Sequence, residues 1–138
     1  MSKKFFVKLV TAEQPYFEGD CEALKIPAFD GMMGVYAGHA PFVSELGTGI
    51  AEIRINDSDI RKFAVQNGFI QIAENEVIIL AERACKPEEV AQDELKQQLE
   101  RTREEMLKQG SLEEKDKAFL DYRWLKANEA LLEDAVRV

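Results

Sequence analysis

The chain has 138 residues, of which 46% are apolar, which is typical of a folded protein with one main core. Asp and Glu outnumber Lys and Arg by 26 to 18, and the formal charge at pH 7 is −8. The basic residues form no run. Direct binding to nucleic acid or to an anionic membrane surface is therefore disfavoured, because both need concentrated positive charge.

The N-terminus and the two cysteines indicate a reducing compartment. Met1 to Lys4 lead directly into a strand-like segment rather than a long apolar stretch, so we expect no signal peptide. Cys21 and Cys85 lie far apart in the sequence and are expected to be free thiols. No apolar run approaches the ~20 residues of a membrane-spanning helix. Membrane association is therefore expected only through a protein partner.

The first part of the chain, from Phe5 to about Ala84, has the pattern of an antiparallel β structure. Short apolar runs alternate with turn residues. The predicted strands are 5–10, 21–26, 32–36, 50–55, 60–65, 69–73 and 77–81. Seven or more short strands with no helix between them favour a sandwich or barrel over a parallel sheet with crossover helices.

Turn chemistry separates these runs. The predicted turns lie at Gly19–Asp20, Asp30–Gly31, Asp57–Asp59 and Glu74–Glu76. Pro27 is expected to end the second strand. The pair Asn67-Gly68 is typical of a tight β-hairpin, because both residues tolerate the positive φ that such turns need. We therefore predict a hairpin there.

After Cys85 the pattern changes to helix. Pro87 suits a first helical turn, and Glu88 and Glu89 follow where negative charge meets the positive end of the helix dipole. An apolar stripe with helical spacing contains Leu95, Leu99, Thr102 and Met106. Gly110 is expected to end this first helix.

A second helix is predicted from the capping-box spacing of Ser111 and Glu114. Its apolar face contains Leu120, Trp124, Ala127, Leu131 and Val138. The short Gly-Ser connection favours an antiparallel helical hairpin, packed through Leu95, Leu99, Met106, Leu120, Trp124 and Leu131. The predicted fold class is thus α+β, with an N-terminal antiparallel β-sandwich (1–86) followed by a C-terminal two-helix antiparallel hairpin (87–138).

The middle of the first half resembles a known family. Residues 26–46 have the sequence IPAFDGMMGVYAGHAPFVSEL, and Gly49 follows. An acidic residue with Gly, a second Gly before two apolar residues, and then Gly-His-Ala-Pro resemble the epsilon subunit of bacterial F-type ATP synthases. Residues 64–84 are similar to that family's last sandwich strands, with Asn67 where a second Gly is common, and residues 10–14 are similar to its opening strand.

The resemblance implies a non-catalytic rotor subunit of the central stalk, which couples ion flow to ATP synthesis. In that family the sandwich lies beside the gamma subunit and on the membrane ring of c subunits. The hairpin either folds against the sandwich or extends along gamma to the catalytic alpha/beta hexamer, where it inhibits ATP hydrolysis. The implied location is peripheral, on the cytoplasmic face of the bacterial inner membrane.

The resemblance also suggests contact residues. It implies a rotor-ring contact at Asp30, Gly31 and Met32, and an interface with gamma or the ring at Gly38 and His39. Met32 replaces a frequent acidic residue of this family, and Ala37 a frequent Pro. We therefore expect an apolar contact where other members have a polar one.

Some bacterial members of this family bind ATP through an Ile/Leu-Asp-x-x-Arg-Ala motif at the start of the first helix. The corresponding residues here are Val90-Ala91-Gln92-Asp93-Glu94-Leu95, so that Ala91 and Glu94 occupy the Asp and Arg positions. A carboxylate in place of the cation repels phosphate. We therefore predict no ATP binding at millimolar nucleotide.

The residues themselves leave other functions to weigh. His39 is the only histidine and could act as a general base, but no nucleophile motif accompanies it, and a structural turn residue is favoured. The glycines of 31–38 and 47–49 lack the Gly-Lys-Ser/Thr ending of a phosphate-binding loop. Neither cysteine has a neighbour at metal-ligand spacing.

We accordingly expect no catalytic, cofactor-binding or metal-binding residue. Two functions from other classes stay open at this point. One is a β-sandwich adaptor or carbohydrate-binding module whose helices serve only to pack or dimerise. The other is a small hydrolase that uses His39.

Overall fold

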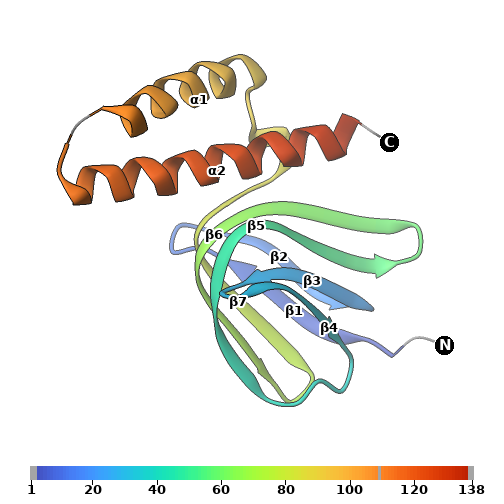
Figure 1. The fold of residues 1–138 in the computed structure, drawn as a ribbon. Helices are drawn as coiled ribbons and strands as arrows, with labels where there is room; N and C mark the ends of the chain where they lie inside the picture. Colours follow the sequence, from blue (N-terminus) through green and yellow to red (C-terminus); the bar gives the residue numbers. More distant parts are fainter. Residues whose placement is uncertain (1–2, 109, 137–138) are drawn as a thin grey trace.

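The computed structural model describes residues 3–108 and 110–136, and shows a β domain followed by two helices (Figure 1). The strands are β1 (Phe5–Val10), β2 (Pro15–Cys21), β3 (Ala23–Ala28), β4 (Gly31–Tyr36), β5 (Phe42–Asn56), β6 (Asp59–Ala73) and β7 (Glu76–Cys85). The helices are a 3₁₀ turn η1 (Pro87–Glu89), α1 (Gln92–Leu107) and α2 (Leu112–Val136). The predicted fold class is confirmed.

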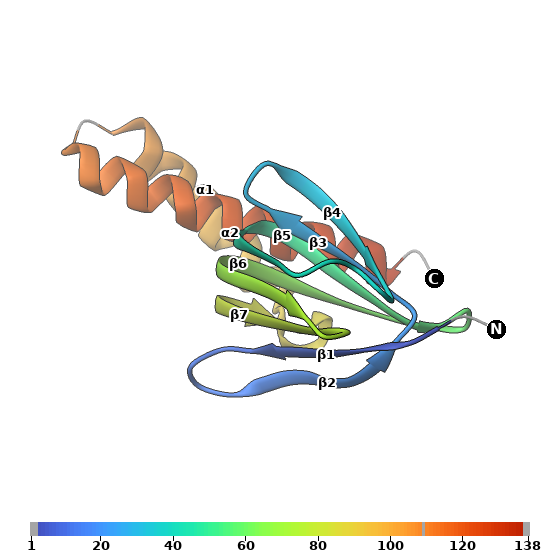
Figure 2. The same ribbon diagram turned by 90° about the horizontal axis from the view of Figure 1, so that it is seen from below.

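The strands form one hydrogen-bonded sheet in the order β2-β1-β7-β6-β5-β3-β4. All neighbours run antiparallel except β1 and β7, which are parallel. The sheet closes over itself: β2 and β6 are not neighbours in it, yet the rings of Phe17 and Phe63 lie 6.5 Å apart. This closure produces the two layers of the sandwich, with β2 and β4 at the borders of the sheet (Figure 2).

The core between the layers takes side chains from every strand. Its largest fully buried members include Leu9, Leu24, Ile26, Ile53, Ile70 and Ile79. Burying one side chain of this size contributes about 1.5–3 kcal/mol. The apolar residues whose alternation predicted the strands therefore form this core, and their burial stabilises the sandwich.

The hairpin predicted at Asn67-Gly68 is wrong, because β6 continues through both residues. They do have positive φ, 55° and 133°, but they bend the strand instead of reversing it. Val65 before the bend and Ile70 after it both join the core, although an unbroken strand places residues five apart on opposite faces. The bend lets one long strand serve both layers.

Two other boundaries differ from the predictions. Gly19 and Asp20 lie inside β2, and the chain turns at Glu22, whose N–H donates to the Arg54 carbonyl at 2.8 Å. Pro27 lies inside β3, where the pairing with β5 is irregular and a residue without an N–H is accommodated. The turn at Asp30–Gly31 and those near residues 57 and 74 are confirmed.

The helix expected at Pro87 is only the 3₁₀ turn η1, because Val90 and Ala91 are extended and α1 begins at Gln92. It ends at Leu107, before Gly110. The N-cap of the second helix is confirmed: the Glu114 N–H donates to Ser111 Oγ at 3.2 Å. Val138 lies outside the described residues. Within 3–108 and 110–136, neither helix is long and apolar enough to cross a bilayer.

Candidate interaction surfaces

The turn between β3 and β4 carries the predicted ring-contact residues Asp30, Gly31 and Met32. Phe29 beside them is 78% exposed and Met32 is 62% exposed. Gly31 has a φ of 131°, and a Cβ placed there would meet open space. The turn thus projects two large apolar side chains into solvent, a costly arrangement unless another surface covers them.

The loop after β4 carries Gly38 and His39, the other predicted contact. The Gly38 N–H donates to Asn75 Oδ1 at 3.0 Å, and Asn75 Nδ2 donates to the Lys4 carbonyl at 3.0 Å. The His39 ring lies edge-on to Phe42 at 6.0 Å, and its Nδ1 is 2.7 Å from the Ala40 carbonyl oxygen. This geometry fits a structural turn residue.

The structure does not bring the two predicted contacts together. They lie at opposite ends of the six-residue strand β4. At about 3.3 Å per residue the strand separates them by about 20 Å. A partner that binds both must therefore extend along β4, or two partners must bind separately.

The predicted hairpin-packing residues fall into three groups. Leu95 and Leu131 are buried. Leu99, Met106 and Trp124 are half-buried. Leu120 keeps 38% of its surface exposed, and its backbone carbonyl accepts a hydrogen bond from Gln66 of β6.

Helix α2 lies across β5 and β6 on the outside of the sandwich (Figure 1). A docking cluster joins them, formed by the buried Ala64, Cys85, Ala127 and Leu131 and flanked by Ile50, Val90 and Trp124. Three of the four buried members are small, which lets the helix approach the sheet closely. Leu131 is the one large side chain that is fully enclosed there.

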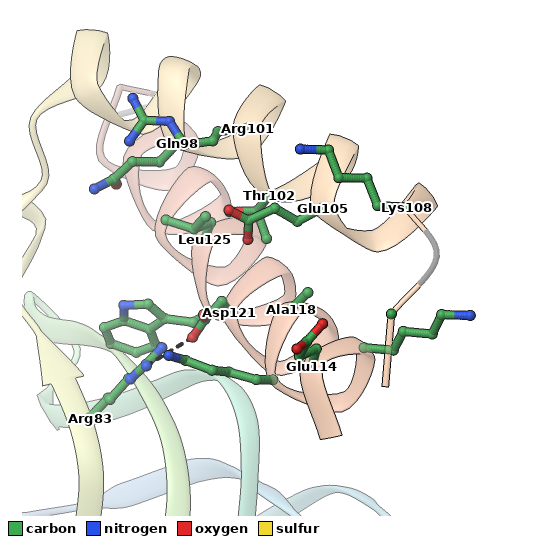
Figure 3. A pocket seen from close by; sticks show the side chains of 14 residues that line it. Arg83, Gln98, Arg101, Thr102, Glu105, Lys108, Glu114, Ala118, Asp121 and Leu125 are labelled. Atoms are coloured by element: carbon green, nitrogen blue, oxygen red, sulfur yellow. Dashed lines mark hydrogen bonds and ion pairs between the residues drawn. The ribbon is translucent and has the colours of Figure 1, made fainter. Parts of the chain in front are cut away.

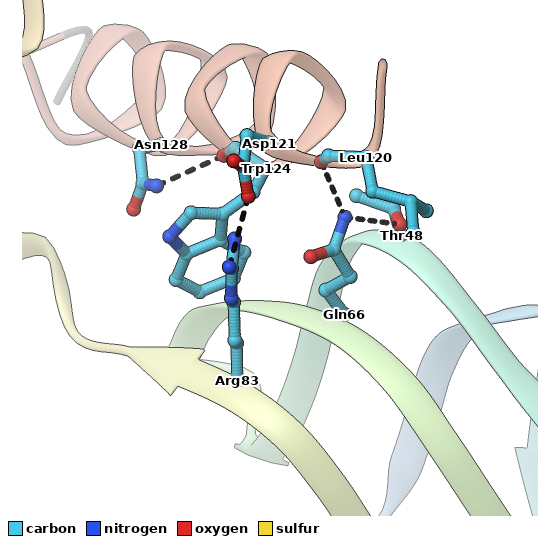
Figure 4. Close-up of polar contacts among 7 residues, drawn as sticks. All are labelled: Thr48, Gln66, Arg83, Leu120, Asp121, Trp124 and Asn128. Carbon is cyan, nitrogen blue, oxygen red and sulfur yellow. Dashed lines mark hydrogen bonds and ion pairs between the residues drawn. The ribbon is translucent and has the colours of Figure 1, made fainter. Parts of the chain in front are cut away.

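Polar contacts complete this docked arrangement (Figure 4). Gln66, 3% exposed, donates from Nε2 to the Leu120 carbonyl at 2.8 Å and to Thr48 Oγ1 at 3.1 Å. Arg83 pairs with Asp121 at 2.9 Å. No buried side-chain N or O atom of the described residues lacks a partner. We call this contact between α2 and the sandwich the seam. It is held by hydrogen bonds and an ion pair as well as by apolar burial.

The Cys85 thiol lies in the same seam and donates to Asn128 Oδ1 at 2.6 Å. Burial raises the pKa of Cys85 to about 12 and that of Cys21 to about 11. Both cysteines are free, as predicted. A thiol that stays protonated is a poor nucleophile, so neither cysteine is suited to covalent chemistry.

A cleft of about 650 Å³ lies between the two helices and the end of β7 (Figure 3). Its basic lining residues are Arg83, Arg101, Lys108, Lys115 and Lys117. Its acidic ones are Glu105, Glu114 and Asp121. Ala91 and Glu94, on which we based the prediction of no ATP binding, do not line it, and that prediction stays a prediction.

A further surface escaped the sequence analysis. Val43, Phe69 and Leu80 are 69%, 57% and 48% exposed on neighbouring strands β5, β6 and β7, with Phe69 directly opposite Leu80. We call these three residues the open sheet face. The run Val77-Ile78-Ile79-Leu80 could have indicated it, since a strand with one solvated face alternates apolar and polar residues.

Among the described residues, no three His, Cys, Asp or Glu side chains lie close enough to hold a metal ion. The features that stand out are the exposed apolar side chains of the β3–β4 turn and of the open sheet face. A family model for the β-sandwich domain of the ATP synthase delta/epsilon chain matches residues 4–87. The epsilon chain 2 of Nitrobacter hamburgensis is 33% identical over 125 residues, which cover 90% of each chain. The chain belongs to the ATP synthase epsilon chain family.

Other relatives extend the match differently. The epsilon chain of Clostridium novyi is 27% identical over 126 residues, or 91% of this chain and 96% of that one. The epsilon chain of Leptospira borgpetersenii is 31% identical over 87 residues, or 63% and 68%. As an epsilon chain, this protein is a stalk subunit of ATP synthase and not a catalytic one. The adaptor and hydrolase hypotheses are thereby set aside.

Two solved structures share the fold. A chain of the Euglena gracilis mitochondrial ATP synthase, a complex of OSCP, F1 and c-ring, has a TM-score of 0.82 at 22% identity, covering 94% of this chain and 81% of that one. A chain of the Tetrahymena thermophila central stalk and c-ring has a TM-score of 0.63 at 15% identity, covering 95% and 98%. At such low identity these likenesses support the fold alone.

Proposed function

We propose that this epsilon chain is a rotor component of the central stalk that helps couple ion flow to ATP synthesis. Its sandwich binds the gamma subunit and the ring of c subunits, and its hairpin restrains ATP hydrolysis at the alpha/beta hexamer. The open sheet face is the observation that carries the proposal, because no described part of the chain covers its large apolar side chains, 48–69% exposed.

Gamma is the partner proposed for the open sheet face. Completing the burial of Val43, Phe69 and Leu80 would contribute part of the about 1.5–3 kcal/mol that each gains from full burial. Three such anchors on a rigid sheet suit a permanent contact that has to withstand torque. The aromatic ring of Phe69 at the middle of this face is the residue type that dominates interface energies.

The ring of c subunits is the partner proposed for the turn at Asp30, Gly31 and Met32. The exposed side chains of Phe29 and Met32 offer an apolar contact there. Through this contact the chain is held peripherally at the cytoplasmic face of the bacterial inner membrane. Its net charge of −8 gives it no electrostatic attraction to anionic lipid of its own.

Regulation is proposed for the hairpin, which is docked in this structure through one large buried side chain and a few polar contacts. Reversing a docked population from 99:1 to 1:99 takes only about 5.5 kcal/mol. Two or three leucine-sized contacts offered by gamma would supply it. The hairpin is therefore suited to leave the sandwich and reach the hexamer.

Co-purification tests the gamma contact. Phe69→Glu is expected to abolish recovery of the tagged chain with gamma and the catalytic hexamer, because the new charge would be buried without a partner. Ile60→Glu is the matched control, since Ile60 is also exposed on β6 (45%) but lies outside the open sheet face. Equal recovery of both variants would contradict the assignment of this surface.

The ring contact has a separate test. Met32→Glu and Asp30→Ala are expected to weaken binding of the isolated chain to ring-containing complexes, measured by sedimentation. Wild-type binding by both variants would count against this turn as the contact.

Truncation after Lys86 tests the regulatory role. ATP hydrolysis by the reconstituted complex is expected to rise, and its further activation by detergent to shrink. If both properties match the wild-type complex, the hairpin is not inhibitory, while the rotor role of the sandwich can still hold.

A further inference from the structure

The open sheet face is part of a larger surface that crosses five strands. β2, β1, β7, β6 and β5 lie side by side in this order (Figure 2). Side chains at paired positions share one face of a sheet, and here that face points away from the core. One row across the strands contains Val10, Leu80, Phe69 and Glu45. The next row contains Glu18, Lys8, Ile78, Gln71 and Val43.

The middle of this surface is apolar. Val10 and Ile78 are half-buried and extend the open sheet face onto β1 and along β7. We call Val10, Val43, Phe69, Ile78 and Leu80 together the apolar strip. The four strands that carry the strip each have a neighbouring strand on both sides, so their backbone groups are already paired. The strip can therefore be covered by the side chains of a partner but not extended by an added strand.

The two ends of the apolar strip are acidic. Glu45 on β5 lies directly opposite Phe69, and Glu18 on β2 lies directly opposite Lys8. Both carboxylates are exposed, and neither takes part in an ion pair within the described part of the chain. Lys8 is half-buried and is the one cation of the two rows. The charge of this surface is therefore complementary to an apolar partner segment with basic ends.

The size of the surface matches a helix. Glu45 and Glu18 are four strand positions apart, which is about 19 Å at about 4.8 Å per strand. A helix of about 13 residues has the same length. The side of the sheet that faces away from the core already accepts a helix before the bend in β6, where Gln66 donates to the Leu120 carbonyl of α2. The apolar strip lies after the bend on the same side.

We propose that the apolar strip is covered by an amphipathic helix of about 13 residues from the neighbouring rotor subunit. The helix carries a lysine or arginine near each end, one paired with Glu45 and the other with Glu18. The inference rests on the proposed function, in which this neighbour is gamma, and it specifies the kind of gamma segment that binds. Burial of the strip supplies the affinity, and the two ion pairs select the segment and fix its direction.

Charge reversal at the two ends tests the inference, with binding of the full chain to the complex of gamma and the catalytic hexamer as the measurement. Glu45→Lys and Glu18→Lys should each weaken binding by about fivefold or more, because an attraction becomes a repulsion. Glu45→Gln is the milder variant and should weaken it by about twofold. Added salt should weaken binding of the wild-type chain more than that of either reversed variant.

Two further variants serve as controls of position and sign. Asp57→Lys makes the same charge change at the exposed turn between β5 and β6, outside the two rows, and should leave binding within about twofold. Lys8→Gln removes the one cation of the two rows and should strengthen binding by about twofold, although it makes the chain more acidic.

The outcomes separate the inference from the proposed function. If Phe69→Glu abolishes binding but the charge variants bind like the wild-type chain, the inference is overturned and the gamma contact stands. If Phe69→Glu also binds normally, both are contradicted. A loss with Asp57→Lys as large as that with Glu45→Lys shows that binding responds only to net charge, and overturns the inference as well.

Discussion

The sandwich and the docked hairpin are held by different kinds of interior. The sandwich core takes large apolar side chains from all seven strands, many of them fully buried. The docking cluster has four buried members, of which only Leu131 is large. From this difference we predict that the hairpin can separate from the sandwich as a unit while the sandwich stays folded.

The free energies of the individual contacts also indicate that the hairpin is held less strongly than the sandwich core. Burial of Leu131 contributes about 1.5–3 kcal/mol, and each hydrogen bond of the seam a net of about 0.5–1.5 kcal/mol. These terms are of the same order as the shift that reverses a two-state population. The sandwich has many such side chains, so the same perturbation would leave it folded.

Gly68→Ala should destabilise the sandwich, which is the more strongly held of the two parts. With φ at 133°, a Cβ at this position would overlap the Leu80 carbonyl oxygen. We expect the free energy of unfolding in urea to fall by about 3 kcal/mol or more. Gly38→Ala is the control, because its φ is 85° but a Cβ there meets nothing within 4 Å, and a loss of about 1–2 kcal/mol is expected. Equal losses would contradict the role of the bend.

Leu131→Ala should weaken only the docking of the hairpin on the sandwich. The cavity is expected to lower the free energy of docking by about 2–4 kcal/mol and leave the sandwich folded. Trp124 is the only tryptophan and flanks the docking cluster, so its fluorescence reports docking, while circular dichroism reports the strands. Leu107→Ala, at a side chain that is 82% exposed, is the control. Simultaneous loss of both signals would show that the two parts are not separable.

Alkaline pH should weaken the sandwich core through Cys21 and the docking cluster through Cys85. Burial holds the pKa of Cys21 at about 11 and that of Cys85 at about 12, above the ordinary value of 9.0. Below pH 9 each buried thiol makes its full contribution to the free energy of unfolding or undocking. That contribution is lost as the pH rises from 9 through the raised pKa, because the thiol of the unfolded or undocked state ionises first.

Two cysteine variants test which thiol affects the sandwich core and which affects the docking cluster. Cys85→Ala should reduce the alkaline loss of docking, and Cys21→Ala the alkaline loss of global stability, in urea titrations at pH 8 and pH 10.5. Unchanged pH dependence in both variants would remove the thiols from the explanation.

Arg83→Ala should have the smallest effect. The pair with Asp121 is partly exposed, 43% and 30%, and such pairs contribute less than about 1 kcal/mol. Docking should weaken by that amount at low salt, and by less at high salt, because of screening. The same change at the exposed Arg103 of α1 should leave docking unaffected. A loss as large as that of Leu131→Ala would show that the seam is mainly ionic.

Local patterns in the sequence predicted much of the fold. Apolar alternation located the strands, and the helical stripe correctly placed Leu95 and Thr102 on the buried side of α1. The error at Asn67-Gly68 has a physical cause: positive φ permits either a reversal or a bend. The choice was made by pairing with β5 and β7 on both sides of the strand, which no local pattern contains.

The surfaces were less predictable. The exposure of Met32 could be expected from its turn, but the open sheet face depends on which strands lie side by side. The contact of Gln66 with the Leu120 carbonyl joins residues 54 positions apart, and only the docked helix reveals it. Interfaces of this kind depend on tertiary arrangement and leave little trace in local sequence.

Native-state hydrogen exchange in increasing urea, below the unfolding transition, tests the separability of hairpin and sandwich most directly. The amides of α1 and α2 should exchange through an opening that costs clearly less free energy than global unfolding, while the core amides of β5, β6 and β7 exchange only by global unfolding. A single opening energy shared by helices and strands would contradict the account.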